Sequence, residues 1–115
     1  MTTDENLWDM EERFWTQGVD SARLMTAKDA VFVFPFPVGI LRGDTMWRQA
    51  EVAQRWRSVV MADRNFSQED NIAVLAYRGS AERGDAPIYH ALCTSTYLND
   101  DRTWLRLAHQ QTPVL

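Results

Sequence analysis

The sequence is poor in the residues on which several common protein classes depend. Its single cysteine, Cys93, allows no internal disulfide and no thiolate cluster for a metal, which fits a reducing compartment and a buried position for Cys93. Its two histidines, His90 and His109, are too few for an all-histidine zinc site. No apolar run approaches the ~20 residues that a membrane-spanning helix needs, so a bilayer span is excluded.

Charge and length narrow the remaining classes. The net charge is -4 and the charges are scattered along the chain, so the sequence offers no basic surface of the kind that nucleic acids require. The N-terminus is polar and acidic with no apolar stretch behind it, which predicts no secretory signal and a cytoplasmic location. The 115 residues are expected to form one domain over residues 1–115, with no cofactor.

Three helices are predicted in the first half of the chain. Thr2 and Glu5 have the spacing of a capping box, and apolar residues recur at helical intervals from residue 7 to residue 15. A short second helix is predicted to follow, and Asp44 is well placed to cap a third. A group of acidic residues is interpreted as the solvated side of the first helix: Asp9, Glu11 and Glu12.

The rest of the chain has the composition of strands. Residues 30–34 are dense in β-forming side chains, and Pro35 and Pro37 end that strand before a turn through residues 39–43. This order of elements indicates an α+β domain, with the helices gathered on one side of a curved antiparallel sheet. Four further strands are predicted, at residues 57–62, 71–77, 88–98 and 103–112.

The later strands carry apolar side chains on both of their faces. Ile72 and Val74 point to one side, and Leu75 and Tyr77 point to the other. A sheet with one face in water would alternate more cleanly between apolar and polar residues. We therefore expect the helices to cover one face and a second copy of the chain to cover the other, in a homodimer built sheet to sheet.

Three segments together resemble a known superfamily. They are the aromatic amphipathic helix at residues 7–15, the strand closed by residues 34–39, and the last strand, which leads into residues 109–113 with the sequence HQQTP. This pattern resembles the nuclear transport factor 2-like superfamily, and within it the SnoaL-like and ketosteroid-isomerase-like branch. The resemblance implies a cystatin-like cone, in which three helices from the N-terminal half pack on the concave face of a curved antiparallel sheet. It also implies a homodimer and a hollow that binds small molecules.

The residues that carry catalysis in ketosteroid isomerases are not present at the matching places. In that family a carboxylate stands just before a proline at the end of the first long strand and acts as the general base. Here Phe34 stands before Pro35. A phenol on the first helix of the family is matched by Phe14 and Trp15, and neither side chain is a phenol. The isomerase machinery is therefore not carried over.

The pairing of the last two predicted strands decides which side chains share a face. If they pair through a tight turn near residues 101 and 102, two sets follow. The first set contains both histidines: His90, Leu92, Thr94, Thr96, Leu105, Leu107, His109 and Gln111. The second set is Tyr89, Cys93, Ser95, Tyr97, Trp104, Arg106 and Gln110. The first set is favoured as the lining of the hollow, and a register slip of one residue would exchange the two.

The candidate site combines bulky rings with imidazole and amide groups. Trp47, near the expected mouth, is the ring predicted to face a ligand. A metal held by both histidines and Asp63 has no supporting spacing, so no metal site is predicted. The predicted ligand-binding residues are Trp15, Phe34, Trp47, Tyr77, His90, His109 and Gln111. No spacing identifies a catalytic residue, and the candidates are His109, His90 and Asp63.

Three functional hypotheses remain open at this point. The first is a protein that binds a small, mostly apolar molecule, with weak or unknown enzymatic activity. The second is a non-catalytic homodimerisation module, in which the rings fill the cone and the histidines serve only packing. The third is an isomerase, hydratase or cyclase that uses a histidine in the pocket as its acid or base.

Overall fold

The structure, a computed structural model, describes residues 2–52 and 56–114. The first half contains the elements α1 (Thr3–Thr16), α2 (Val19–Leu24), β1 (Thr26–Phe34), β2 (Gly39–Arg42) and α3 (Asp44–Val52). Four longer strands follow: β3 (Ser58–Glu69), β4 (Ile72–Glu82), β5 (Tyr89–Asp100) and β6 (Thr103–Pro113). The predicted α+β class is confirmed.

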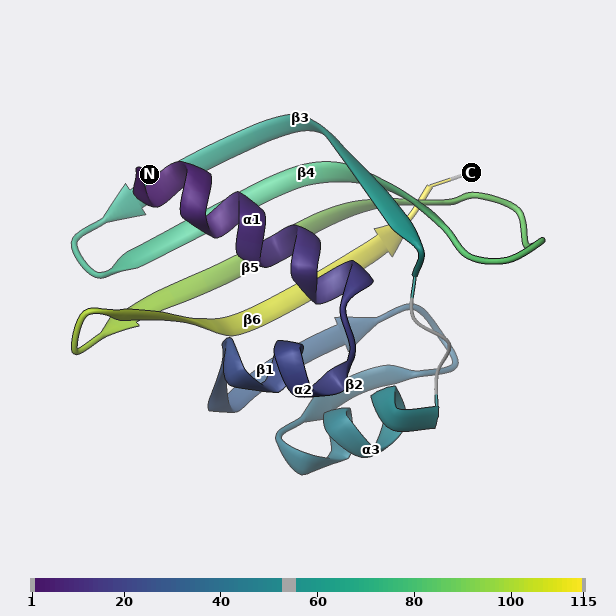
Figure 1. Cartoon of the computed structure of the whole chain (residues 1–115), viewed down its shortest axis with the longest axis horizontal. Coiled ribbons are helices and arrows are strands. Elements are labelled where there is room, and N and C mark those ends of the chain that lie inside the picture. The colour runs from purple at the N-terminus through teal and green to yellow at the C-terminus, as the bar shows by residue number, and fades with distance from the viewer. Residues whose placement is uncertain (1, 53–55, 115) are drawn as a thin grey trace.

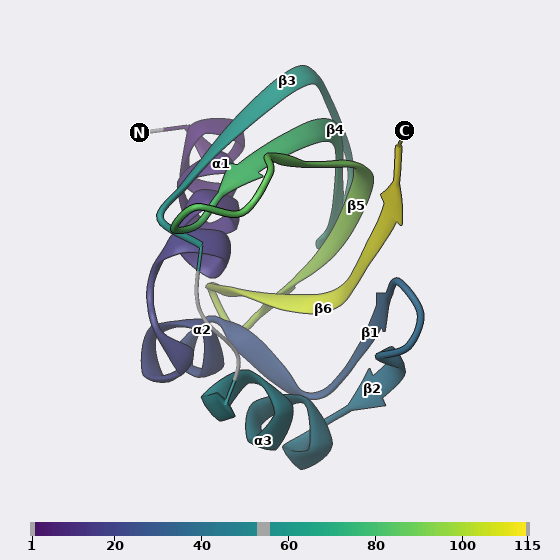
Figure 2. The same ribbon diagram turned by 90° about the vertical axis from the view of Figure 1, so that its right-hand side faces the viewer.

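The strands form one curved, open sheet in the order β2-β1-β6-β5-β4-β3. Figure 2 shows the sheet bending around the helices, which lie on its concave side. Neighbouring strands are antiparallel, with the exception of β1 and β6, which are parallel. The sheet therefore differs from the expected antiparallel one in this pair. Parallel strands need a long connection, and here the connection is the chain from β2 to β5.

The turn predicted at residues 39–43 is instead a short strand. The reversal occurs earlier, at residues 35–38, where the backbone N–H of Val38 donates to the carbonyl oxygen of Pro35 across 3.1 Å. Gly39 follows with a φ of 77°, in the left-handed region that glycine adopts without strain. Gly39 then pairs with Phe34, so β2 returns along β1.

The strand predicted at residues 57–62 does not end there, because a bulge at residues 63–64 lets it continue as one long strand. The register between β3 and β4 shifts between Ala62 and Asn65, and Asp63 has a φ of 52°. Aspartate tolerates this left-handed conformation better than most residues, so the strand bends there and continues to Glu69. Aspartate and asparagine are common in turns, and here the same residues form a bulge within the strand.

Helix α1 lies across the concave face of β3–β6, whereas α2 and α3 lie against β1 and β2 (Figure 1). The predicted cap of α1 is confirmed, because the backbone N–H of Glu5 donates to the Thr2 hydroxyl across 3.1 Å. The side chains under α1 are fully or almost fully buried and come from both layers: Leu7, Trp8, Trp15, Ala73, Leu75, Cys93 and Tyr97. The buried position expected for Cys93 is confirmed, and burial raises the pKa of its thiol to about 12.

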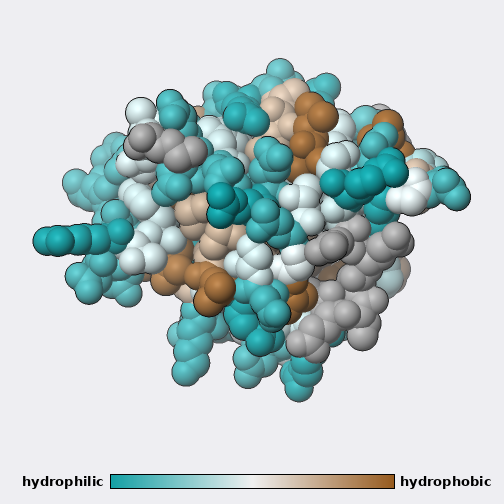
Figure 3. All heavy atoms as spheres, in the orientation of Figure 1, coloured by the Kyte–Doolittle hydropathy of each residue, from teal (hydrophilic) through white to brown (hydrophobic). Residues whose placement is uncertain are grey.

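The face that carries the helices is mostly hydrophilic, with apolar side chains in small separate patches (Figure 3). None of the described helices is long and apolar enough to cross a bilayer.

Candidate functional site

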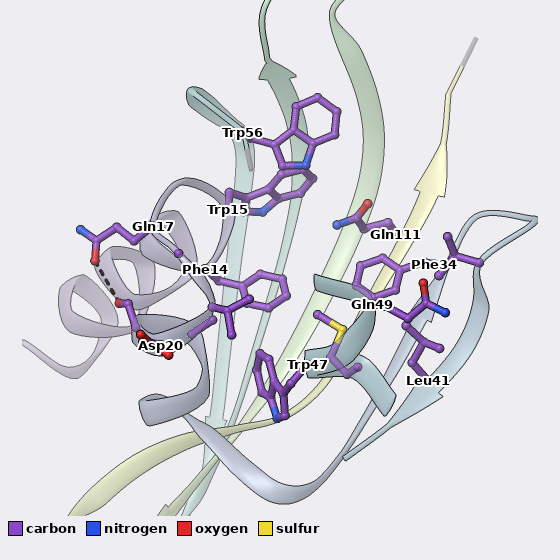
Figure 4. A pocket seen from close by; sticks show the side chains of 16 residues that line it. Phe14, Trp15, Gln17, Asp20, Phe34, Leu41, Trp47, Gln49, Trp56 and Gln111 are labelled. Carbon is purple, nitrogen blue, oxygen red and sulfur yellow. Dashed lines mark hydrogen bonds between the residues drawn. The ribbon is translucent and has the colours of Figure 1, made fainter. Parts of the chain in front are cut away.

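A hollow of about 710 Å³ lies between the end of α1, the helices α2 and α3, and the strands β1 and β6. This volume is typical of pockets that bind small molecules. We call it the aromatic hollow, because five aromatic side chains line it (Figure 4): Phe14, Trp15, Phe34, Trp47 and Trp56. Its polar lining consists of Gln17, Asp20, Ser21, Gln49 and Gln111.

A buried ring, Phe32, holds much of this wall from behind. Its centroid lies 5.9 Å from that of Phe14 and 6.0 Å from that of Phe34, and both pairs are stacked. Trp47 meets the same ring edge-on at 6.0 Å. Because Phe32 is paired on both sides, with Leu41 of β2 and His109 of β6, and is only 1% exposed, three wall rings rest on a fixed support.

Two charged side chains lie deep behind the hollow, in contact with each other. Glu11 of α1 and Arg106 of β6 are both 0% exposed, and their closest N–O distance is 3.4 Å. The interpretation of Glu11 as a solvated residue is therefore wrong. A buried ion pair needs further hydrogen bonds to offset the loss of hydration, and the surrounding strands supply them.

Three hydroxyl groups donate to the Glu11 carboxylate. The donors are Tyr77 at 2.5 Å, Ser95 at 2.6 Å and Tyr97 at 2.6 Å. Arg106 donates to the Tyr97 oxygen at 2.6 Å. With His109, whose Nδ1 lies 3.3 Å from Glu11, these residues form what we call the Glu11 cluster: Glu11, Tyr77, Ser95, Tyr97, Arg106 and His109.

The cluster fixes the protonation of its members. Burial by itself raises the pKa of Glu11, but the hydrogen bond with His109 and the charge of Arg106 outweigh burial and hold that pKa far below its usual range. Burial raises the pKa of Tyr77 and of Tyr97 well above the ordinary value. At neutral pH the cluster therefore contains a carboxylate, a guanidinium and two phenols that keep their protons.

His109 is the member of the Glu11 cluster that contacts residues of the aromatic hollow. It is 1% exposed, and its ring centroid lies 4.7 Å from that of Phe14. Its Nδ1 atom lies 2.7 Å from the Ser95 hydroxyl, and its Nε2 atom lies 3.0 Å from the amide nitrogen of Gln111. Both ring nitrogens are therefore engaged by protein groups.

Gln111 connects this buried network to the hollow. Its amide oxygen accepts a hydrogen bond from the Tyr89 hydroxyl at 3.1 Å. The Tyr89 ring stacks on Trp56 with a centroid distance of 5.4 Å, and the guanidinium of Arg83 lies 4.3 Å from the Trp56 centroid on the indole face. Ring stacking therefore holds Trp56 in the wall of the hollow, and hydrogen bonds hold Gln111 there.

The predicted ligand-binding residues divide into two groups. Four of them line the hollow: Trp15, Phe34, Trp47 and Gln111. Tyr77 and His109 lie behind it, where Tyr77 accepts a hydrogen bond from the indole N–H of Trp15 at 2.9 Å. His90 is exposed and lies beside Ser80, with 2.9 Å between its Nδ1 atom and the Ser80 hydroxyl.

The prediction that His90 and His109 share a face is wrong. The predicted parity holds near the turn, where Tyr97 pairs with Arg106. Beyond this pair, Leu107 of β6 is an extra residue between the partners of Tyr97 and Thr96, and this bulge shifts the register by one residue, so that Ser95 lies opposite His109. The concave face of β5 is therefore the odd-numbered set that includes Ser95, and His90 lies on the convex face.

Asp63, the remaining catalytic candidate, lies on β3, which is separated by β4 from the strand of His90 and by β4 and β5 from the strand of His109. Its side chain is 73% exposed on β3, and its carboxylate is 3.8 Å from the guanidinium of Arg78. In the described part of the chain, no three His, Cys, Asp or Glu side chains lie together in a way that could hold a metal ion.

Sequence reasoning did not identify Glu11 and Arg106, although the sequence does contain a signal for Glu11. Leu7, Glu11 and Trp15 are spaced four residues apart and therefore lie on one side of the helix. Leu7 and Trp15 belong to the apolar face, so an acidic residue midway between them predicts a buried carboxylate with a partner. Arg106 has no comparable signal, because its face depends on the bulge.

No protein-family model and no curated protein match the sequence. Solved structures match its fold. A candidate ketosteroid isomerase from Parabacteroides distasonis has a TM-score of 0.85 at 15% identity, covering 98% of this chain and 89% of that chain. An NTF2-like protein from Cytophaga hutchinsonii has a TM-score of 0.80 at 16% identity, covering 99% and 100%.

A third similar structure is a candidate calcium/calmodulin-dependent protein kinase II association domain from Xanthomonas campestris. Its TM-score is 0.77 at 17% identity, covering 94% of this chain and 83% of that chain. Another matched structure is described as having a cystatin-like fold. The chain therefore has the nuclear transport factor 2-like, cystatin-like fold that its sequence pattern implied. At these identities the likeness concerns the fold alone, and a function has to be argued from the site.

Proposed function

We propose that the protein binds a small, mostly apolar molecule in the aromatic hollow. One observation carries the proposal: a hollow of about 710 Å³ is lined by five aromatic side chains, and several of their rings rest on buried neighbours. Flat apolar molecules stack well on such rings. Because the wall is already supported from behind, binding does not have to order it.

Binding is favoured over acid–base turnover by the position of His109. A general acid or base has to reach the substrate within hydrogen-bond distance. Both nitrogens of His109 are within 3.0 Å of protein partners, and Gln111 stands between the ring and the hollow. An isomerase, hydratase or cyclase that uses this histidine remains the alternative hypothesis, and it requires Gln111 to move aside.

A thermal-shift screen against steroids, polyketides, terpenoids and small organic acids tests the proposal. A ligand at a hundred times its dissociation constant stabilises the folded state by about 2.7 kcal/mol, which for a domain of this size is on the order of 10 °C. We expect a shift of this size from at least one apolar class. If no class shifts the midpoint, the binding proposal is wrong and the homodimerisation module becomes the better hypothesis.

We also propose that a second copy of the chain covers the convex face of the sheet. A row of directly opposed residues crosses four strands on that face: Val31, Ala108, Thr96 and Val74. Val31 and Val74 are each 36% exposed, and Leu92 on the same face is 47% exposed. Apolar side chains in the middle of a wide sheet are typical of an interface, and the similarity to an association domain agrees with it.

Light scattering after size-exclusion chromatography tests this second proposal. We expect a mass of twice the 13.3 kDa chain for the wild type and of one chain for Val74→Lys, because a lysine at the centre of the interface would be buried without a partner. The matched control is Leu24→Lys, which changes an 81% exposed residue on α2 and should leave the mass doubled. A wild-type mass of one chain would contradict the proposal.

A further inference from the structure

Gln111 is the polar side chain at the floor of the aromatic hollow. It comes from β6 and is 9% exposed, and Figure 4 shows its amide turned toward the rings across the hollow. The other polar side chains of the described lining are exposed or half-buried and belong to the segments around α2 and α3: Gln17, Asp20, Ser21 and Gln49. Gln111 is therefore the group that an apolar ligand meets at depth.

The hydrogen bonds behind Gln111 determine which of its atoms faces which partner. The Glu11 carboxylate can only accept, so the Ser95 hydroxyl donates to it. The Ser95 oxygen then accepts the N–H of His109 Nδ1. When Nδ1 carries the only N–H of the ring, Nε2 is an acceptor, and it faces the amide nitrogen of Gln111 at 3.0 Å.

The amide oxygen of Gln111 is engaged as well, since Tyr89 donates to it. Burial raises the pKa of Tyr89 to about 12, so this phenol keeps its proton at neutral pH. The amide nitrogen carries two N–H groups, and His109 takes one of them. Among the described residues this amide nitrogen makes no further hydrogen bond, so its second N–H has no protein acceptor.

The surroundings of this N–H group favour an uncharged acceptor. None of the described lining residues is a lysine or an arginine, and the buried cation behind the wall, Arg106, is paired with Glu11. The indole N–H of Trp15 is already donated to Tyr77. A carboxylate at the floor would lose its hydration without meeting a counter-charge, whereas a carbonyl oxygen needs only one donor.

We infer that the ligand is a flat, uncharged, mostly apolar molecule whose carbonyl oxygen accepts the second N–H of Gln111. This inference rests on the proposed function, because it names the class of ligand for the same hollow. The preference for a carbonyl oxygen originates at the Glu11 carboxylate. Glu11 accepts from Ser95, Ser95 accepts from His109, and His109 accepts from the amide nitrogen of Gln111, which therefore presents an N–H group to the ligand.

The test compares two flat probes that differ at one group. Fluorenone has a carbonyl where fluorene has a methylene. Their dissociation constants are measured by titration calorimetry for the wild type, for Gln111→Leu and for the matched control Gln68→Leu, which changes an exposed glutamine of β3 outside the hollow. We expect the preference for fluorenone over fluorene to fall roughly three- to tenfold in Gln111→Leu, the range of one net hydrogen bond, and to stay unchanged in Gln68→Leu.

The infrared spectrum of fluorenone bound to the wild type gives a second measurement, which stands even if Gln111→Leu does not fold. A hydrogen bond lowers the carbonyl stretching frequency, so we expect a lower frequency than in an apolar solvent. An unshifted stretch or an unchanged preference would overturn the carbonyl assignment and leave the pocket standing. Binding of neither probe to the wild type would overturn the pocket itself, because a hollow of this volume should take both.

Discussion

The two halves of the sheet use their interior in opposite ways. We call α1 with the strands β3–β6 the closed half, because buried side chains fill the space between the helix and the sheet. The Glu11 cluster lies within this half. The half formed by β1, β2, α2 and α3 is open, because its rings enclose the aromatic hollow. Helix α1 serves both halves, with Glu11 in the first and Phe14 and Trp15 in the second.

This difference shows how a small domain can keep a hollow without collapsing. The closed half holds α1 in place by a buried ion pair and several hydrogen bonds, and the hollow is built against that fixed helix. Changes in the closed half should therefore reduce the stability of the whole protein, whereas changes in the open half should reduce binding more than stability.

Replacing Glu11 by alanine should have the largest effect. It leaves the Arg106 guanidinium buried without its partner, and breaking a buried ion pair on one side costs about 3–5 kcal/mol. Urea unfolding of Glu11→Ala measures the loss. Glu12→Ala, at the neighbouring exposed position, is the matched control and should change the free energy of unfolding by no more than about 0.5 kcal/mol. Similar losses in the two variants would show that the cluster does not stabilise the closed half.

Acid should weaken the same interaction. The pKa of Glu11 is lower in the folded chain than its ordinary value of 4.5, so its contribution is complete above about pH 4.5 and is lost as the pH falls below that. The difference in unfolding free energy between the wild type and Glu11→Gln should therefore be largest at pH 7 and shrink toward pH 3. A difference that stays constant over this range would mean that Glu11 is not the ionised centre of the cluster.

The two histidines should respond very differently to the same substitution. His109→Gln removes a buried ring between Ser95 and Gln111 and should cost about 1–3 kcal/mol, because buried groups lose their partners. His90→Gln changes an exposed residue and should cost no more than about 0.5 kcal/mol. Chemical unfolding of both variants makes the comparison, and equal costs would contradict the placement of His109 at the boundary between the two halves.

The smallest effect is expected in the open half. Trp56→Leu removes a ring from the wall of the hollow and should weaken fluorenone binding by about 0.5–1.5 kcal/mol, the contribution of one aromatic contact. Trp104→Leu is the matched control, since Trp104 is a half-buried ring that packs on the closed half. If both variants weaken binding equally, then the ligand does not bind in the hollow.

Much of the fold could be predicted because its signals are local. The cap of α1 depends only on Thr2 and on a residue three positions later. The later strands are predicted by runs of β-forming residues. The short strand at residues 39–42 could not be separated from a turn, because its only pairing partner is β1. Local patterns therefore predicted the kinds of elements better than their pairing.

The site could be predicted only in part, because it depends on register. Alternation along β5 and β6 predicts two faces, but one extra residue in β6, Leu107, decides which face of β5 lies beside His109. Leucine is an ordinary strand residue, so nothing local marks that bulge. Trp15, Phe34 and Trp47 were predicted correctly as lining residues. They lie on α1, β1 and α3, so their positions do not depend on the register between β5 and β6.

The parallel pairing of β1 with β6 has a consequence for synthesis of the chain. Val31 has Ala108 as its partner, so β1 leaves the ribosome long before the strand that will flank it exists. Until β6 is made, the hairpin of β1 and β2 presents an unpaired edge, which is the kind of surface on which nascent chains stick to one another. Because Phe34 comes from β1 and Gln111 from β6, the aromatic hollow is among the last features of the domain to assemble, and its lining is completed only when this edge is covered.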